Sequence, residues 1–119
     1  MHRRACPPGS DATTMMRFFD CNTYIGRPTK APTGRPTSAG VSLEGLLAAM
    51  DRAGIERAVV WHVAQRDYHP VAGNQLLAEA VAGQDRLVGC WTILPAHCGE
   101  LGDLDGWFSA ATAANVRVF

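Results

Sequence analysis

The chain has 119 residues, of which 47% are hydrophobic and 18% are charged, and its eleven basic residues balance its eleven acidic ones. This length allows at most one domain with a modest core, and the composition is that of an ordinary soluble globular protein. The zero net charge predicts no binding to nucleic acid or to an anionic membrane, and no apolar run reaches the ~20 residues of a membrane span. The four cysteines form no Cys-x-x-Cys pair, which predicts a reduced, cytoplasmic protein without a disulfide framework.

Residues 1–15 are polar, rich in proline and small residues, and follow neither the helical nor the strand period. They predict a disordered leader, which leaves residues 16–119 as the folded domain. A short buried strand is expected from about residue 17 to residue 22, because Phe18 and Phe19 precede Asp20 and a polar turn. Three prolines and two glycines in residues 27–40 predict a long loop after this strand.

A helix is expected between Ser42, a good N-cap, and Gly54, a good left-handed cap at the other end. Glu44 in its first turn complements the helix dipole. The helix carries one apolar stripe with the spacing i, i+3, i+4 and i+7, formed by Leu43, Leu46, Leu47 and Met50. Residues 57–63 follow, and the continuous apolar run from Ala58 to Trp61 within them predicts a strand covered on both faces.

Two further helix–strand units are expected after this strand. Residues 66–70 predict a loop, and a helix then begins at about residue 71 or 74 and ends at residue 82. Its apolar face is expected to contain Leu76, Leu77, Ala80 and Val81. A third strand is predicted at residues 87–93. The last helix is predicted from apolar residues at helical spacing, namely Leu101, Leu104, Trp107, Phe108 and Ala111. Asn115 is expected to end this helix as a left-handed cap, and a fourth strand is expected from residue 116.

This alternation predicts an α/β fold with parallel strands joined by right-handed crossovers. Two architectures fit the order: the first half, strands one to four, of a TIM-like (β/α)8 barrel, or a small doubly wound sheet. A full barrel needs ~250 residues, so the chain is expected to form a partial barrel. The exposed edges of its first and last strands predict a homo-oligomer.

Residues 20–26, Asp-Cys-Asn-Thr-Tyr-Ile-Gly, resemble the strand-one signature Asp-x-His-Thr-His-x-Gly of the amidohydrolase-related metal-dependent hydrolases. Asn22 and Tyr24 stand at the positions of the two metal-binding histidines. Residues 50–59 are similar to the family's Met-Asp-x-x-Gly-Ile-x-x-Ala-Val run, Asn74 and residues 85–89 to its second helix and third strand, and residues 115–118 to its fourth strand.

The resemblance implies a TIM barrel whose intact form is a metal-dependent hydrolase or a decarboxylase of a small organic acid. In the family, the strand-one histidines and ligands from later strands hold a divalent metal such as zinc. An amide and a phenol are poor zinc ligands, so no metal cofactor is predicted for this chain. The 119-residue chain alone is expected to lack a complete site and to be inactive.

The expected site lies at the carboxyl ends of the first two strands. Asp20 is a candidate catalytic carboxylate, with the capping of its own turn as an equal alternative. Asn22, Tyr24 and His62 are candidate substrate-binding residues, and all four are expected to line one polar pocket, although His62 could simply be a polar strand terminus. Trp61 and Trp91 are predicted to belong to the core.

Two alternatives to a barrel enzyme remain at this point. One is a non-catalytic α/β module completed by self-association or by a partner chain. The other is a receiver-like doubly wound domain with Asp20 as an acceptor carboxylate, but the further acidic residues expected beside Asp20 are absent from the strand.

Overall fold

The structure, a computed structural model, describes residues 16–29 and 39–119. The predicted leader, residues 1–15, and most of the predicted loop at residues 27–40 lie outside the described residues. The described strands form one parallel sheet in the order β1-β2-β3-β4. They are β1 (Phe18–Ile25), β2 (Ile55–His62), β3 (Leu87–Cys90) and β4 (Val116–Val118). The prediction of an α/β protein with parallel strands is confirmed.

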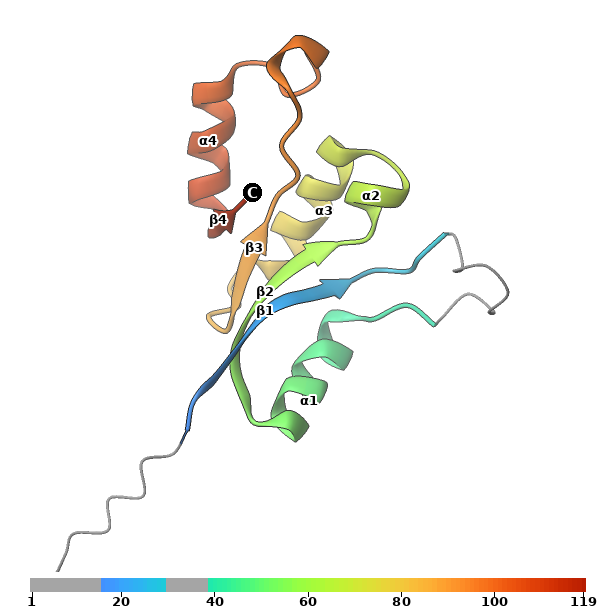
Figure 1. The fold of residues 1–119 in the computed structure, drawn as a ribbon, viewed down its shortest axis with the longest axis vertical. Helices are drawn as coiled ribbons and strands as arrows, with labels where there is room; N and C mark the ends of the chain where they lie inside the picture. Colours follow the sequence, from blue (N-terminus) through green and yellow to red (C-terminus); the bar gives the residue numbers. More distant parts are fainter. Residues whose placement is uncertain (1–15, 30–38) are drawn as a thin grey trace, which may run out of the picture.

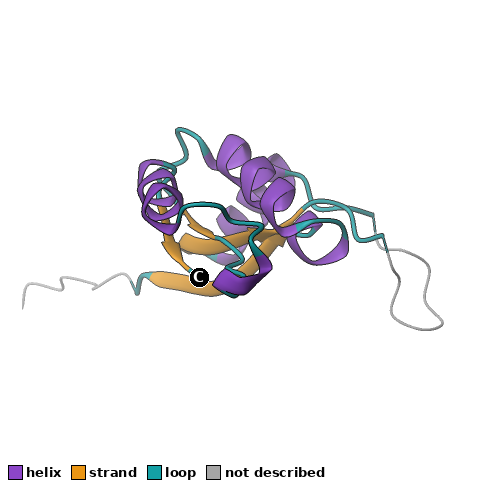
Figure 2. Cartoon of the chain, turned by 90° about the horizontal axis from the view of Figure 1, so that it is seen from above, coloured by secondary structure: helices purple, strands orange, loops and turns teal. Residues whose placement is uncertain are grey.

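Helices occupy the connections between the strands, and the main helices lie on one face of the sheet. They are α1 (Leu43–Ala53), α2 (Ala64–Asp67), α3 (Pro70–Val81), the short 3-10 turn η1 (Ala96–Cys98) and α4 (Leu104–Ala113). Figure 1 shows β2 and β3 passing in front of α3, and Figure 2, seen from above, shows the main helices on one side of the sheet with the other side open. Right-handed crossovers that all advance in the same direction place their helices on the same face.

Local signals in the sequence explain both ends of α1 and the turn that follows α4. The Ser42 hydroxyl accepts a hydrogen bond of 3.0 Å from the backbone N–H of Gly45, and Gly54 ends α1 with a φ of 68°. Asn115 has a φ of 56°, and its side-chain amide donates to the backbone oxygen of Leu87 at 3.1 Å. These predicted caps are confirmed, because a short amide side chain or no side chain at all tolerates the left-handed conformation.

The second connection differs from the prediction. The four-residue helix α2 begins at Ala64 and extends into the expected loop at residues 66–70, and it is too short to show a period in the sequence. The next helix begins at Pro70, where the missing N–H costs nothing in the first turn. Leu76, which was expected to be buried, is 44% exposed, and Asn74 is buried instead. Leu77 and Val81 are buried as predicted and Ala80 packs against the core, so Leu76 alone was assigned to the wrong face of α3.

The core lies between the helices and the covered face of the sheet. It contains Leu46 and Met50 of α1, Leu77 and Val81 of α3, Ala58 and Val60 of β2, and, among others, Leu87, Trp91, Ala111 and Val116. Trp91 is buried, as predicted. Met50, Leu77 and Val60 have almost no exposed surface, so α1, α3 and β2 each place a fully buried side chain in this core.

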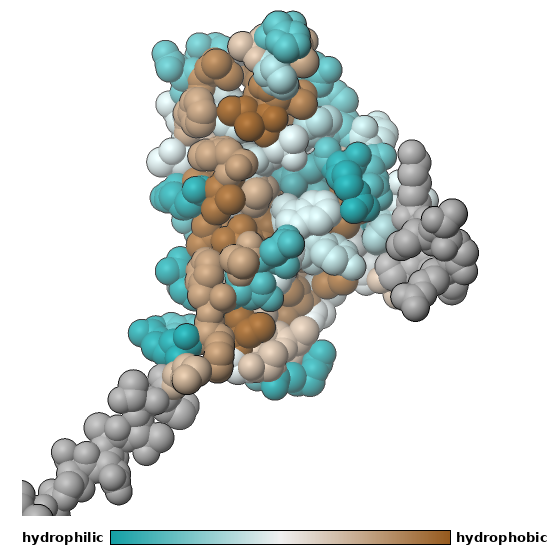
Figure 3. Space-filling view, in the orientation of Figure 1, coloured by the Kyte–Doolittle hydropathy of each residue, from teal (hydrophilic) through white to brown (hydrophobic). Residues whose placement is uncertain are grey.

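The opposite face of the sheet has no helix over it in the described part of the chain. Phe18 and Phe19 at the start of β1 are 51% and 54% exposed, so the prediction of a buried first strand was wrong. Figure 3 shows an apolar band on this side of the molecule, running upward from the start of β1 toward α4, while polar groups gather over α2. The apolar residues of β1 would be buried only if something covered this face.

Candidate functional site

Asp20 does not lie at the carboxyl end of β1, as the sequence predicted. It is the third residue of an eight-residue strand, which continues through Asn22 and Tyr24 to Ile25. A bulge separates Asp20, which pairs with Ala58, from Thr23, which pairs with Val60. The Asp20 Oδ1 atom accepts a hydrogen bond of 3.0 Å from the backbone N–H of Asn22 inside this bulge. Asp20 therefore supports its own backbone, and it does not join the pocket that was expected to contain it.

Asn22 and Tyr24 converge on one residue of the neighbouring strand, Trp61. The indole Nε1–H of Trp61 donates to the Asn22 Oδ1 atom at 3.2 Å. The rings of Tyr24 and Trp61 lie 5.6 Å apart between centroids and are tilted by 42°. The Thr23 hydroxyl, between them in sequence, donates to the backbone oxygen of Val59 at 2.7 Å and holds the register of the two strands. Trp61 is only partly buried, so its prediction as a core residue was wrong.

Arg66 and Asp67 of α2 extend this group of side chains. The Arg66 guanidinium lies over the Trp61 ring, 5.6 Å from its centroid, and its Nε atom donates to the Asp67 Oδ1 atom at 2.6 Å. The Asp67 Oδ2 atom accepts from the backbone N–H of Thr29 at 3.0 Å. The hydrogen bonds from Arg66 and Thr29 lower the pKa of Asp67 to about 2. We call Asn22, Tyr24, Trp61 and Arg66 the aromatic–arginine cluster.

His62 lies apart from this cluster. It pairs with Ile25, and neighbouring residues of a strand point to opposite faces, so Ile25 and His62 lie on the covered side while Tyr24 and Trp61 lie on the open side. The His62 Nδ1 atom accepts a hydrogen bond of 3.1 Å from the backbone N–H of Ala64, which puts the proton of the neutral ring on Nε2. The predicted substrate-binding residues are thus divided between the two faces of the sheet.

Burial makes the stability of the protein depend on the protonation of His62. Partial burial lowers the pKa of His62 below its usual value, because desolvation disfavours the charged ring. A histidine whose pKa is lower in the folded than in the unfolded state makes its full contribution to stability above the unfolded pKa of about 6.5. This contribution is lost as the pH falls from there through the folded-state pKa. Protonation would also remove the acceptor for Ala64. We expect the free energy of unfolding, measured with urea at pH 7.5 and 5.5, to decrease at the lower pH.

The control for this prediction is a pair of histidine variants. His62→Gln keeps an acceptor near Ala64 without a titrating ring, so its pH dependence should be flatter than that of the wild type. His69→Gln changes a half-exposed ring near Glu100 and should leave the pH dependence mostly intact. Equal pH dependence in the wild type and in His62→Gln would contradict the assignment.

A buried network of amide side chains joins the carboxyl ends of β2 and β3. Gln65 donates through Nε2 to the Asn74 Oδ1 atom at 2.8 Å and to the backbone oxygen of Cys90 at 2.9 Å, and its Oε1 atom accepts from the backbone N–H of His62 at 3.2 Å. Asn74 binds both the backbone N–H and the backbone oxygen of Thr92, each at 2.9 Å. These bonds replace strand pairing at Thr92, which explains why β3 ends at Cys90 and not at residue 93.

Sequence reasoning did not find this network or Arg66 as functional positions. Asn74 was noted only for its resemblance to a family helix, although a polar residue inside an apolar stripe is the signal that could have found it. Gln65 and Arg66 lie in a helix too short for any periodicity to reveal. Their partners come from other elements, so no local pattern in the sequence points to them.

The described residues hold no evident metal centre. Within residues 16–29 and 39–119, no three histidine, cysteine or acidic side chains lie close enough together to hold a metal ion. No helix in the same ranges is long and apolar enough to cross a membrane.

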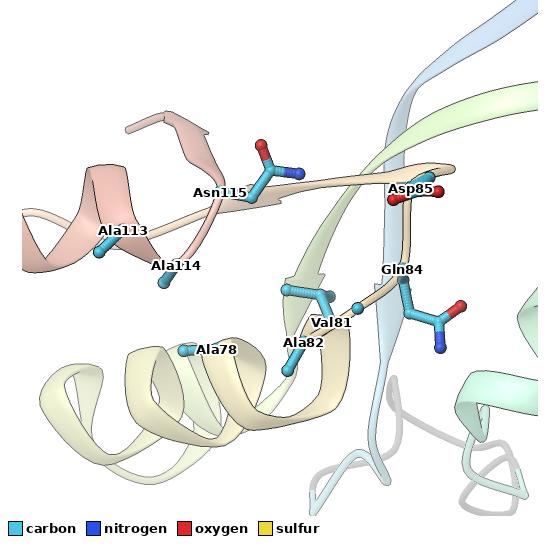
Figure 4. Close-up of a pocket in the computed structure, with 9 residues that line it drawn as sticks. Ala78, Val81, Ala82, Gln84, Asp85, Ala113, Ala114 and Asn115 are labelled. Atoms are coloured by element: carbon cyan, nitrogen blue, oxygen red, sulfur yellow. The ribbon is translucent and has the colours of Figure 1, made fainter.

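A pocket of about 480 Å³ opens at the other end of the sheet. Its walls come from the ends of α3 and α4 and from the turns before β3 and β4, as Figure 4 shows. Alanines form much of the wall, Gln84 and Asp85 stand on the turn before β3, and the Asn115 amide is already bonded to Leu87. This pocket lies at the amino ends of the strands, away from the aromatic–arginine cluster.

No protein-family model, no curated protein and no solved structure matches this chain.

Proposed function

We propose that this chain forms strands one to four of an amidohydrolase-related (β/α)8 barrel, and that the intact barrel is a metal-dependent hydrolase or decarboxylase of a small organic acid. The observation that carries this proposal is the strand order β1-β2-β3-β4 with the main helices on one face. In a doubly wound sheet the crossovers reverse direction at a switch point and place helices on both faces. In a barrel they advance in one direction, and the uncovered face becomes the interior.

The positions of Asn22 and Tyr24 support the same proposal. In the family signature two histidines at this spacing point together into the barrel. Here both side chains contact Trp61 on the uncovered face, so two ligands placed at residues 22 and 24 would converge. In the intact barrel, Asn22 and Tyr24 would contact the substrate from the carboxyl half of strand one, and Asp20 would support the bulge that orients Asn22.

The variant Asn22→His/Tyr24→His tests this alignment. We expect the double variant to bind Zn²⁺ at one site at least about tenfold more tightly than either single variant, because two imidazoles on one face chelate the ion. Isothermal titration calorimetry on the full chain, with Asn22→His and Tyr24→His as matched controls, measures the difference. Equal affinities of the double and single variants would mean that the side chains do not converge, and the family proposal would fail with them.

The wild-type chain is expected to contain no stoichiometric divalent metal. An amide oxygen and a phenol do not replace two imidazoles as zinc ligands, so neither a bound ion nor metal-dependent hydrolysis is expected. Elemental analysis of the purified protein measures this. One zinc or manganese per chain, lost in Asp20→Ala or Asn22→Ala, would contradict it.

A second candidate function is a non-catalytic module completed by self-association or by a partner chain. It is favoured by the exposed aromatic side chains on β1 and after β4, namely Phe18, Phe19 and Phe119, and by the open edges of β1 and β4. Analytical ultracentrifugation should then show dimers or larger species. A compact monomer with a cooperative thermal transition would contradict self-association.

A further inference from the structure

We propose that the Arg66 guanidinium binds the carboxylate of a small organic acid, at a subsite formed by the aromatic–arginine cluster. The inference rests on the proposed function, which places the substrate at the carboxyl ends of the strands. It adds Arg66 as the group that binds the carboxylate there. None of the residues expected from the sequence supplies a positive charge there; Arg66 does.

The Arg66 side chain is held in place although 61% of its surface is exposed. Its guanidinium lies over the face of Trp61, and its Nε atom is bonded to Asp67, a side chain that is only 6% exposed. Asp67 is fixed in turn by the backbone of Thr29. A long, flexible side chain normally loses conformational entropy when it binds a ligand, and here these contacts restrict it beforehand.

Among residues 16–29 and 39–119, the two terminal nitrogens of Arg66 have no hydrogen-bond partner and could bind a ligand. The hydrogen bond to Asp67 uses Nε, and no hydrogen bond joins either Nη atom to another residue in the described ranges. These two nitrogens form one edge of the guanidinium fork, which matches the two oxygens of a carboxylate in a bidentate pair.

The surroundings of Arg66 favour a monoanion with an organic body. Asp67 already offsets the charge of Arg66, so recognition rests on the two directional hydrogen bonds of the guanidinium and on the apolar rings, and a dianion such as phosphate gains no net charge attraction. The Trp61 ring under the guanidinium, together with the Tyr24 ring that contacts it, supplies apolar surface beside the charge. Asn22 fixes the Trp61 ring through its indole N–H, so the apolar wall and the charge are held in one arrangement.

The test is a titration of the ¹⁵N-labelled full chain with sodium benzoate, followed by NMR at constant ionic strength with sodium chloride as balance. The chain has three tryptophans, and Trp61→Phe identifies the indole signal of Trp61. We expect the Trp61 indole and Arg66 Nε signals to shift with saturation in benzoate and not in chloride. Arg66→Gln should weaken binding by about tenfold or more, since a charge-assisted bidentate pair is lost.

Two further variants separate recognition from structure. Arg66→Lys keeps the charge but not the fork, and it should also weaken benzoate binding while the thermal transition changes little. Arg52→Gln removes the same charge from the exposed face of α1 and should bind benzoate like the wild type. The proposal is overturned by an absence of saturable shifts in the wild type, by equal binding in wild type and Arg66→Gln, or by tighter binding of inorganic phosphate than of benzoate. Since no metal enters this titration, its result is independent of the zinc experiment on residues 22 and 24.

Discussion

Replacing Asn74 with alanine is expected to lower the free energy of unfolding by about 3 kcal/mol, because it leaves both backbone groups of Thr92 and part of the Gln65 amide without partners inside the protein. Asn74 is only 3% exposed, so water does not readily replace the lost hydrogen bonds. The better helix propensity of alanine returns no more than about 0.7 kcal/mol. For a domain of this size the loss corresponds to a fall of roughly 10–20 °C in the melting temperature.

The matched control is the next residue in the same helix. Gln75 is exposed and bonds only Glu79, four residues later, so Gln75→Ala should change the free energy of unfolding by less than about 0.5 kcal/mol. Urea denaturation followed by circular dichroism measures both variants. Similar stabilities for the two variants would show that the buried network does not hold the ends of β2 and β3 together.

Gly73→Ala is expected to destabilise the protein by about 3 kcal/mol or more, since over-packing against a rigid backbone cannot be relieved by a rotamer change. A Cβ atom on Gly73 would lie 2.3 Å from the backbone nitrogen and 2.5 Å from the Cα atom of Gln65. The two short helices α2 and α3 would have to move apart. This movement would displace Gln65 from its bonds to Asn74 and Cys90 and so act on the same network.

Gly45 offers the comparison for this second variant. It also lies within a helix, but a Cβ atom there would meet only the Ser42 hydroxyl oxygen, at 3.3 Å. Gly45→Ala should therefore change the free energy of unfolding by no more than about 1 kcal/mol, within the helix-propensity difference of the two residues. Thermal melts of both variants provide the measurement. A Gly73→Ala protein as stable as Gly45→Ala would mean that α2 does not pack closely on α3.

These two predictions concern the site as well as the fold. The network formed by Gln65 and Asn74 fixes the start of α2, and α2 carries Arg66 next to Gln65. In the Asn74→Ala and Gly73→Ala proteins the Arg66 guanidinium should therefore lose its position over Trp61. Weaker benzoate binding in any folded fraction of these variants would be consistent with a subsite that depends on restriction of Arg66.

The sequence by itself determined the helices and strands whose signals are local. The period of Leu46 and Met50, the Ser42 and Gly54 caps and the left-handed Asn115 are properties of short segments, and they gave α1, the end of α4 and the parallel alternation of strands and helices. The limits of β1 and β3 were wrong because pairing with β2 and the side chain of Asn74 decide them, and both partners belong to other parts of the chain.

Only the tertiary structure decided which residues meet. Tyr24 pairs with Trp61, and His62 is the next residue along β2, so strand alternation puts His62 and Tyr24 on opposite faces of the sheet. Asp20 lies away from the carboxyl end of β1 because this eight-residue strand continues to Ile25. Trp61 contacts Asn22, Tyr24 and Arg66 across 39, 37 and 5 positions of sequence, as read from their residue numbers. Local propensity and periodicity carry no information about such pairs, because the register and packing of separate elements determine which residues meet.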